Sequence, residues 1–106
     1  MVDFGDKVLW ITLAEVKGKL YEGKKFKIID DVTEEDDMFN KGSKKYVIHM
    51  IEPESGNRYN GNLNNTSIYG LMKAWGKETV NWSGNFVTIE MQIVKGKEAI
   101  IYKAVA

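Results

Sequence analysis

The chain lacks cysteine and carries a single histidine, His49. Without cysteine there is no disulfide framework and no thiolate zinc site, and one imidazole does not supply the histidine cluster of a catalytic zinc centre. We therefore expect neither a metal site nor another cofactor. The single proline, Pro53, leaves the rest of the chain free to donate backbone hydrogen bonds to a sheet.

The chain also lacks a long apolar run. No stretch of the sequence reaches the ~20 apolar residues that a membrane-spanning helix needs. The first ten residues, MVDFGDKVLW, carry acidic residues where a secretory signal would carry basic ones. The sequence predicts a protein without a membrane segment and with a cytoplasmic location.

Net charge is the third thing the chain lacks, since 15 lysine and arginine residues balance 15 acidic residues. Proteins that bind nucleic-acid phosphates are usually basic, so this balance counts against such a partner. The charges are segregated, however. Acidic residues gather in residues 30–37, and lysines flank them at Lys24, Lys25, Lys27, Lys41, Lys44 and Lys45. Segregation of this kind can still produce one basic face.

The 106 residues fit one domain, which we place at residues 1–106. Near its start, Thr12 is followed three residues later by Glu15, the arrangement of a capping box, and Gly18 supplies a stop. This spacing predicts a short N-terminal helix.

Three strands are expected next. Phe26 and Ile28 alternate with polar residues after Lys24, which indicates a half-buried strand. β-Branched and aromatic residues dominate residues 45–51, and after the turn at residues 53–57 a weaker strand covers residues 58–63. The last two segments are expected to form a hairpin.

A helix and two further strands complete the expected order. Apolar residues at Ile68, Leu71, Met72 and Trp75 have helical spacing, with Asn65 or Thr66 as the cap and Gly76 as the stop. Residues 85–94 and 98–104 alternate in period two around a tight turn and predict a second hairpin.

Five strands with a helix between the third and fourth is the order of an OB-like Greek-key barrel, in which the helix closes one end. The fold class we predict is therefore mainly β, with this helix and the short N-terminal one. A roll or an SH3-like barrel shares the same element count and stays open as an alternative.

The segment from Asn64 to Val87 resembles a pattern in small phage and archaeal single-stranded-DNA-binding proteins of OB type. Shared features are a helix ending in Gly-Lys and the Trp-x-Gly motif, present here as Trp82-Ser83-Gly84 before a strand. Residues 13–18 resemble the element that precedes the first barrel strand in those proteins. Asn85 stands where family members usually carry a lysine.

This resemblance implies a non-catalytic protein that binds single-stranded DNA with little sequence preference. Bases would stack on aromatic rings while cations follow the phosphates. The usual surface of such a barrel is the outer face of the second and third strands. The candidate residues there and on the first strand are Lys25, Lys27, Lys44, Lys45, Tyr46, Arg58 and Tyr59. Tyr46 and His49 cannot both face outward on an unbroken strand, and we interpret His49 as a satisfied, half-buried residue.

Two features keep more than one interpretation. Trp82 either closes the end of the barrel against Trp75 and Leu71 or offers a stacking surface. The acidic run at residues 30–37 is either a solvated loop kept mobile by like charges, a site for a divalent cation, or a mimic of nucleic acid.

The chain shows no nucleophile, base and acid order and no phosphate-binding glycine loop, so we expect no enzymatic activity. The alternative function is an OB-like subunit for protein interaction or assembly that binds no nucleic acid. The sequence distinguishes neither DNA from RNA nor a monomer from a homodimer.

Overall fold

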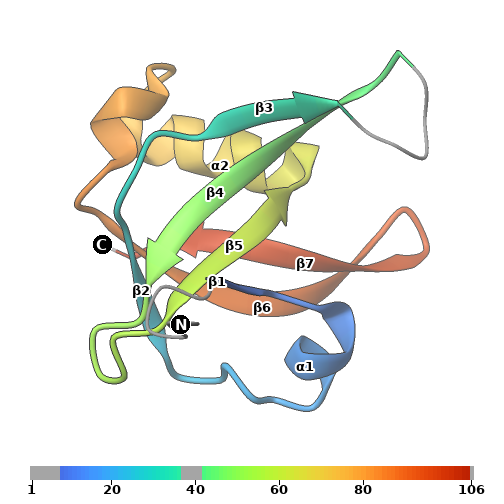
Figure 1. Ribbon diagram of the computed structural model, residues 1–106. Helices are drawn as coiled ribbons and strands as arrows, with labels where there is room; N and C mark the ends of the chain where they lie inside the picture. Colours follow the sequence, from blue (N-terminus) through green and yellow to red (C-terminus); the bar gives the residue numbers. More distant parts are fainter. Residues whose placement is uncertain (1–7, 37–41, 106) are drawn as a thin grey trace, which may run out of the picture.

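The computed structural model describes residues 8–36 and 42–105 (Figure 1). Its strands are β1 (Val8–Trp10), β2 (Lys25–Ile28), β3 (Thr33–Asp36), β4 (Lys44–Ile51), β5 (Arg58–Leu63), β6 (Phe86–Val94) and β7 (Lys97–Ala104). The helices are α1 (Leu13–Lys17), α2 (Asn65–Trp75) and the single 3₁₀ turn η2 (Thr79–Trp82). None of the helices in the described part of the chain is long and apolar enough to cross a membrane.

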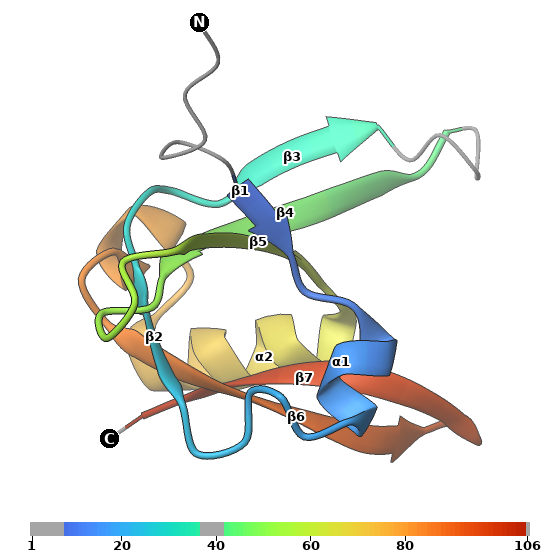
Figure 2. The ribbon, with the colours of Figure 1, turned by 60° about the horizontal axis from the view of Figure 1, so that its bottom comes forward.

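The strands form one sheet in the order β1-β5-β4-β2-β6-β7, and β3 pairs with β4 beside β2. All pairs are antiparallel except β1 with β5, which is parallel. The prediction of a mainly β protein is confirmed. The sheet is not closed into a barrel, because no ladder joins β5 to β7 in residues 8–36 and 42–105. The two ends of the sheet curve over each other with α2 between them (Figure 2).

A closed barrel would need the free edges of β5 and β7 to pair with each other, but a strand and two side chains already occupy these edges. β1 pairs with β5 over Arg58–Asn60, on the edge of β5 opposite β4. On β7, the Asn64 Nδ2 donates to the Ile100 carbonyl over 2.9 Å, and the Tyr102 amide donates to the Ser67 Oγ over 3.0 Å. Since both edges already have partners, the sheet stays open.

The first predicted strand forms as β2, and an additional strand, β3, follows it along β4. β2 and β3 pair with the same edge of β4, β2 at Met50 and Ile51 and β3 at residues 44–47. Between the two ladders, residues 29–32 stand opposite residues 48 and 49 alone. Such a bulge bends a strand and sharpens its twist. β2 consequently turns away toward β6 while β3 continues along β4.

α1 begins where the sequence indicates, and α2 begins earlier than expected. The Thr12 Oγ1 accepts from the Glu15 amide and the Glu15 carboxylate accepts from the Thr12 amide, so the predicted capping box is present at α1. α2 is capped by Asn64 rather than by Asn65 or Thr66, and it ends at Gly76 with φ 91°. The structure has two strands, β1 and β3, that the sequence did not predict. α2 therefore follows the fifth strand of the chain, whereas it was expected after the third.

Trp82 belongs to the core. Its side chain is 1% exposed, its indole N–H donates to the Gly76 carbonyl over 3.0 Å, and its ring meets Trp75 edge to face at 6.2 Å. The interpretation of Trp82 as the closing residue of the hydrophobic core is therefore confirmed, and its ring is not available as a stacking surface.

Tyr102 is buried in the core, and its hydroxyl has no hydrogen-bond partner within residues 8–36 and 42–105. Gly61 faces it so closely that a Cβ there would lie 2.0 Å from the Tyr102 Oη. Glycine is therefore required at position 61 for steric reasons. Burial raises the pKa of the Tyr102 phenol above its ordinary value of 10.0.

We expect Ser67→Ala to lower the free energy of unfolding by about 1–3 kcal/mol, because the Tyr102 amide would lose its acceptor inside the protein. Urea denaturation measures the change. Thr66→Ala, an exposed position on the same helix, is the control and should change stability little. Equal stability of both variants would contradict the role given to Ser67.

We expect the stability of the protein to fall as pH rises above about 10, because Tyr102 can ionise in the unfolded chain but not in the core. Its raised pKa means that the contribution is complete below the unfolded pKa and is lost above it. Tyr102→Phe should lose less stability than the wild type between about pH 9 and about pH 11, as measured by urea denaturation. Tyr69→Phe, at an exposed position, should behave as the wild type.

Candidate functional site

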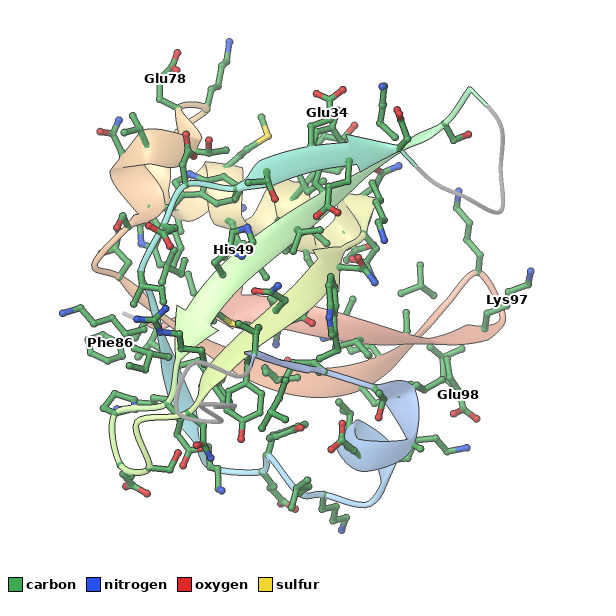
Figure 3. The ribbon with its side chains drawn as sticks, in the orientation of Figure 1. Glu34, His49, Glu78, Phe86, Lys97 and Glu98 are labelled. Atoms are coloured by element: carbon green, nitrogen blue, oxygen red, sulfur yellow. The ribbon has the colours of Figure 1, made fainter. Side chains whose placement is uncertain are left out.

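The outer face of β1, β5 and β4 gathers aromatic, cationic and amide side chains. Cross-strand partners point to the same side of a sheet. One row across the strands contains Trp10, Asn60 and His49, and the next contains Val8, Arg58, Ile51 and Lys27. We call this surface the outer face; Figure 3 shows His49 on it, near the middle of β4.

His49 is the centre of a hydrogen-bonded row. Its Nδ1 lies 2.8 Å from the Asn60 Oδ1, and its Nε2 lies 2.9 Å from the Thr33 Oγ1. The side chain is half-buried, and both ring nitrogens have partners. The interpretation of His49 as a satisfied histidine is confirmed. The row fixes the spacing of β3, β4 and β5 beneath the outer face.

Trp10 presents its indole to solvent beside this row. It is 43% exposed, and the Lys45 Nζ lies 5.6 Å from its ring centroid, within the range of a cation–π contact. A flat aromatic face and a positive charge therefore stand next to each other on the outer face. An exposed aromatic ring with a cation beside it can take one stacked base of an anionic ligand.

The predicted cations are exposed except for Lys45, which is half-buried, and they do not all share this surface. Lys27 and Arg58 lie on the outer face with Lys45. Lys25 points to the same side of β2 as Lys27 and sits opposite Thr88 of β6. Lys44 points to the other side of β4 and forms an ion pair with Asp36. Four of the predicted cations thus lie along one side of the sheet.

The two predicted tyrosines lie elsewhere. Tyr46 is 39% exposed, but it points to the inner side of β4 and lines a groove against α2. Tyr59 is 7% exposed, and its ring meets Tyr21 at 5.7 Å and Phe26 at 5.3 Å, edge to face in both cases.

The expectation that Tyr59 offers a stacking ring is therefore wrong. β5 alternates, so that Arg58, Asn60 and Asn62 face outward while Tyr59, Gly61 and Leu63 are buried. The polar residues of this strand suggested that it contributes little to the core, but every residue on its inner side is buried.

Part of the acidic run is an exposed strand and not the loop that like charges predict. Thr33–Asp36 form β3, in which Glu35 lies opposite Lys45 and Asp36 opposite Lys44. Opposite charges across an antiparallel pair stabilise it, and this outweighs the repulsion along the strand. Asp37 and Lys41 lie outside the described residues. Among those that are described, no group of three histidine, aspartate or glutamate side chains converges on a metal-sized site.

Trp10 is the residue that sequence reasoning missed. Because of the capping box at Thr12, the residues before it were assigned to the approach to a helix. A strand of three residues is also too short to show a clear period-two pattern. The available signal was the apolar run Val8-Leu9-Trp10-Ile11 just before the helix cap. Of these residues Ile11 alone is buried, so the other three remain at the surface.

Comparisons with protein-family models, with curated proteins and with solved structures find no match for this chain.

We expect Tyr59→Ala to destabilise the fold by about 3–5 kcal/mol, the cost of deleting a buried aromatic ring. Thermal or urea denaturation measures this. Tyr46→Ala, at the partly exposed tyrosine of β4, should cost much less. A Tyr59→Ala variant as stable as the wild type would contradict the packing described above.

Proposed function

We propose that this chain binds single-stranded nucleic acid, with DNA as the expected ligand, on the outer face of β1, β5 and β4. The observation that carries the proposal is the exposed indole of Trp10 with the Lys45 ammonium over its ring. Stacking on such a ring is worth ~1–3 kcal/mol per base and tolerates any base, so little sequence preference is expected. No catalytic step is part of the proposal.

The pairing order of the sheet supports the placement. From β5 through β4 and β2 to β6 and β7, the neighbours follow the order expected of an OB-like arrangement, without its closure. In that arrangement the central strands, here β4 and β5, carry the ligand on their outer side. The resemblance of residues 64–87 to small single-stranded-DNA-binding proteins points to the same ligand.

The zero net charge is compatible with a basic surface because the ion pairs among the described residues do not involve the cations of the outer face. Ion pairs join Lys17 to Glu98 and Lys103 to Glu90. Glu52, which is buried, lies 3.6 Å from the Lys24 ammonium. Lys27, Arg58 and Lys45 form no ion pair with any described residue.

Glu35 is the acid closest to this surface in the pairing register, since it lies opposite Lys45 on the same side of the sheet. It would repel a phosphate at that end. We therefore place the phosphates of the nucleic acid near Arg58 and Lys27, and one of its bases on the Trp10 ring. The missing cysteines favour the cytoplasm as the place of action.

We expect Trp10→Ala to weaken binding of a labelled poly-thymidine oligonucleotide by ~1–3 kcal/mol, about 5- to 150-fold in Kd, because one stacking surface is lost. Fluorescence anisotropy at low and higher salt measures it. Lys27→Ala and Arg58→Ala should each flatten the slope of log K against log salt by about 0.7 if each contacts one phosphate. Poly-uridine in parallel tests DNA against RNA.

Lys97→Ala is the matched control, because it removes one exposed lysine at the turn between β6 and β7, away from His49 and the outer face (Figure 3). It should leave Kd unchanged within about twofold. The proposal fails if the wild type does not bind at low salt, or if Trp10→Ala binds as tightly as the wild type while remaining folded.

A further inference from the structure

The row of the outer face that contains Arg58 continues past β2 to β6. Lys27, the member of that row on β2, has Phe86 as its partner on β6. Because cross-strand partners point to the same side of a sheet, the Phe86 ring lies on the same side as Arg58 and Lys27. Phe86 is 37% exposed. The outer face therefore extends to β6 and has an exposed aromatic ring at each end, Trp10 on β1 and Phe86 on β6.

A hollow lies beside Phe86. Its volume is about 370 Å³, within the range of small binding pockets. It lies between the start of β2 and the turn that follows β4, and Lys25 and Pro53 line it together with Phe86. Figure 3 shows Phe86 next to the end of β4. An exposed ring at the wall of an open hollow can stack with a nucleobase that enters it.

The charged groups at the hollow favour a base inside it and phosphates beside it. Glu52 is buried and lies 3.6 Å from the Lys24 ammonium, so these two charges balance each other. Glu54 also lines the hollow and forms no ion pair with any described residue, so it repels a phosphate there. Lys25 and Lys27 point to the outer side of β2 and are likewise unpaired within the described part of the chain. They can attract the phosphates that flank the base.

The two exposed rings are too far apart for one nucleotide to contact both. The sheet order from β1 through β5, β4 and β2 to β6 places four strand spacings between Trp10 and Phe86. At about 4.8 Å per spacing, the two positions are about 19 Å apart along the sheet. A stacked strand advances about 3.4 Å per nucleotide, so about six nucleotides cover this distance.

We propose that Phe86 is a second stacking position for single-stranded nucleic acid, and that the nucleic acid crosses the strands of the sheet from Trp10 to Phe86. This inference rests on the function proposed above. One base stacks on Trp10, the following phosphates pass Arg58 and Lys27, and a later base enters the hollow at Phe86. The ligand that uses the whole surface is therefore a segment of about six or more nucleotides, a size within the range of related binding surfaces.

The test compares oligothymidines of three and eight nucleotides, with Kd measured for each from amide chemical shifts in NMR titrations. Phe86→Leu keeps an apolar side chain and removes the ring. It should weaken binding of the eight-nucleotide ligand about fivefold or more, because one stacked base is lost. A ligand of three nucleotides reaches one ring at a time, so its Kd should change by no more than about twofold.

Three further variants separate stacking from other effects. Phe86→Trp retains an aromatic ring and should bind the eight-nucleotide ligand at least as tightly as the wild type. Tyr69→Ala removes an exposed aromatic ring from α2, away from the outer face, and should leave Kd within about twofold. Trp10→Ala combined with Phe86→Leu should lose about the product of the two separate fold-changes, because the two positions are far apart. Dispersed amide spectra show that each variant is folded.

The inference is overturned if folded Phe86→Leu binds the eight-nucleotide ligand as tightly as the wild type, or if it weakens both ligands equally. In either case the nucleic-acid proposal stands as long as Trp10→Ala weakens binding. If the wild type binds neither ligand, both proposals fail. Weakening by Phe86→Leu without any weakening by Trp10→Ala contradicts both the stacking role of Trp10 and the path across the sheet.

Discussion

The attachment of α2 to the edge of β7 determines the shape of this sheet. A buried serine hydroxyl and an asparagine amide satisfy backbone groups that a neighbouring strand would otherwise take. Unpaired backbone groups inside a protein are costly, so these two side chains replace a ladder at the point where a closed barrel would have one. The helix can then sit between the two ends of the sheet, and its apolar stripe faces the core around Leu71 and Trp82.

The open sheet leaves two chemically different surfaces. Outside, the rows through His49 and Arg58 are polar and cationic, with one exposed indole. On the other side, the groove between β4 and α2 is mainly apolar. The same strand, β4, contributes Lys45 to the first surface and Tyr46 to the second, because successive residues point to opposite faces. β4 thus separates two surfaces of different chemical character.

Local patterns predicted much of the fold. The capping box at Thr12, the stripe ending at Trp75 and the alternation around Lys95 each depend on residues close in sequence, and each element forms. The strands that were missed depend on distant partners. β1 is only three residues long and pairs with β5, and β3 requires the lysines of β4 to offset its acids. Pairings of this kind leave no periodic signal in the strand itself.

The candidate site was predictable to the same degree. Lys27 and Arg58 could be placed because alternation alone assigns their faces. The same alternation places Tyr59 on the other side from Arg58, where it packs against Tyr21 and Phe26, so its burial was predictable and was missed. Trp10 could not be placed, because its exposure follows from where β1 docks. The open sheet was predicted as a closed barrel for a similar reason, because closure is decided by hydrogen bonds between residues 35 or more positions apart.

The docking of β1 affects when this strand forms during folding and how easily it opens in the folded protein. A three-residue parallel strand that joins positions 8–10 to positions 58–60 must close a long loop of chain for few hydrogen bonds. Such a segment joins late in folding and opens first in the folded state, at a free energy well below that of global unfolding. Because Trp10 lies on it, any ligand that holds the indole also slows the opening of the strand. Amide exchange at the N-terminal edge and ligand occupancy are therefore thermodynamically linked.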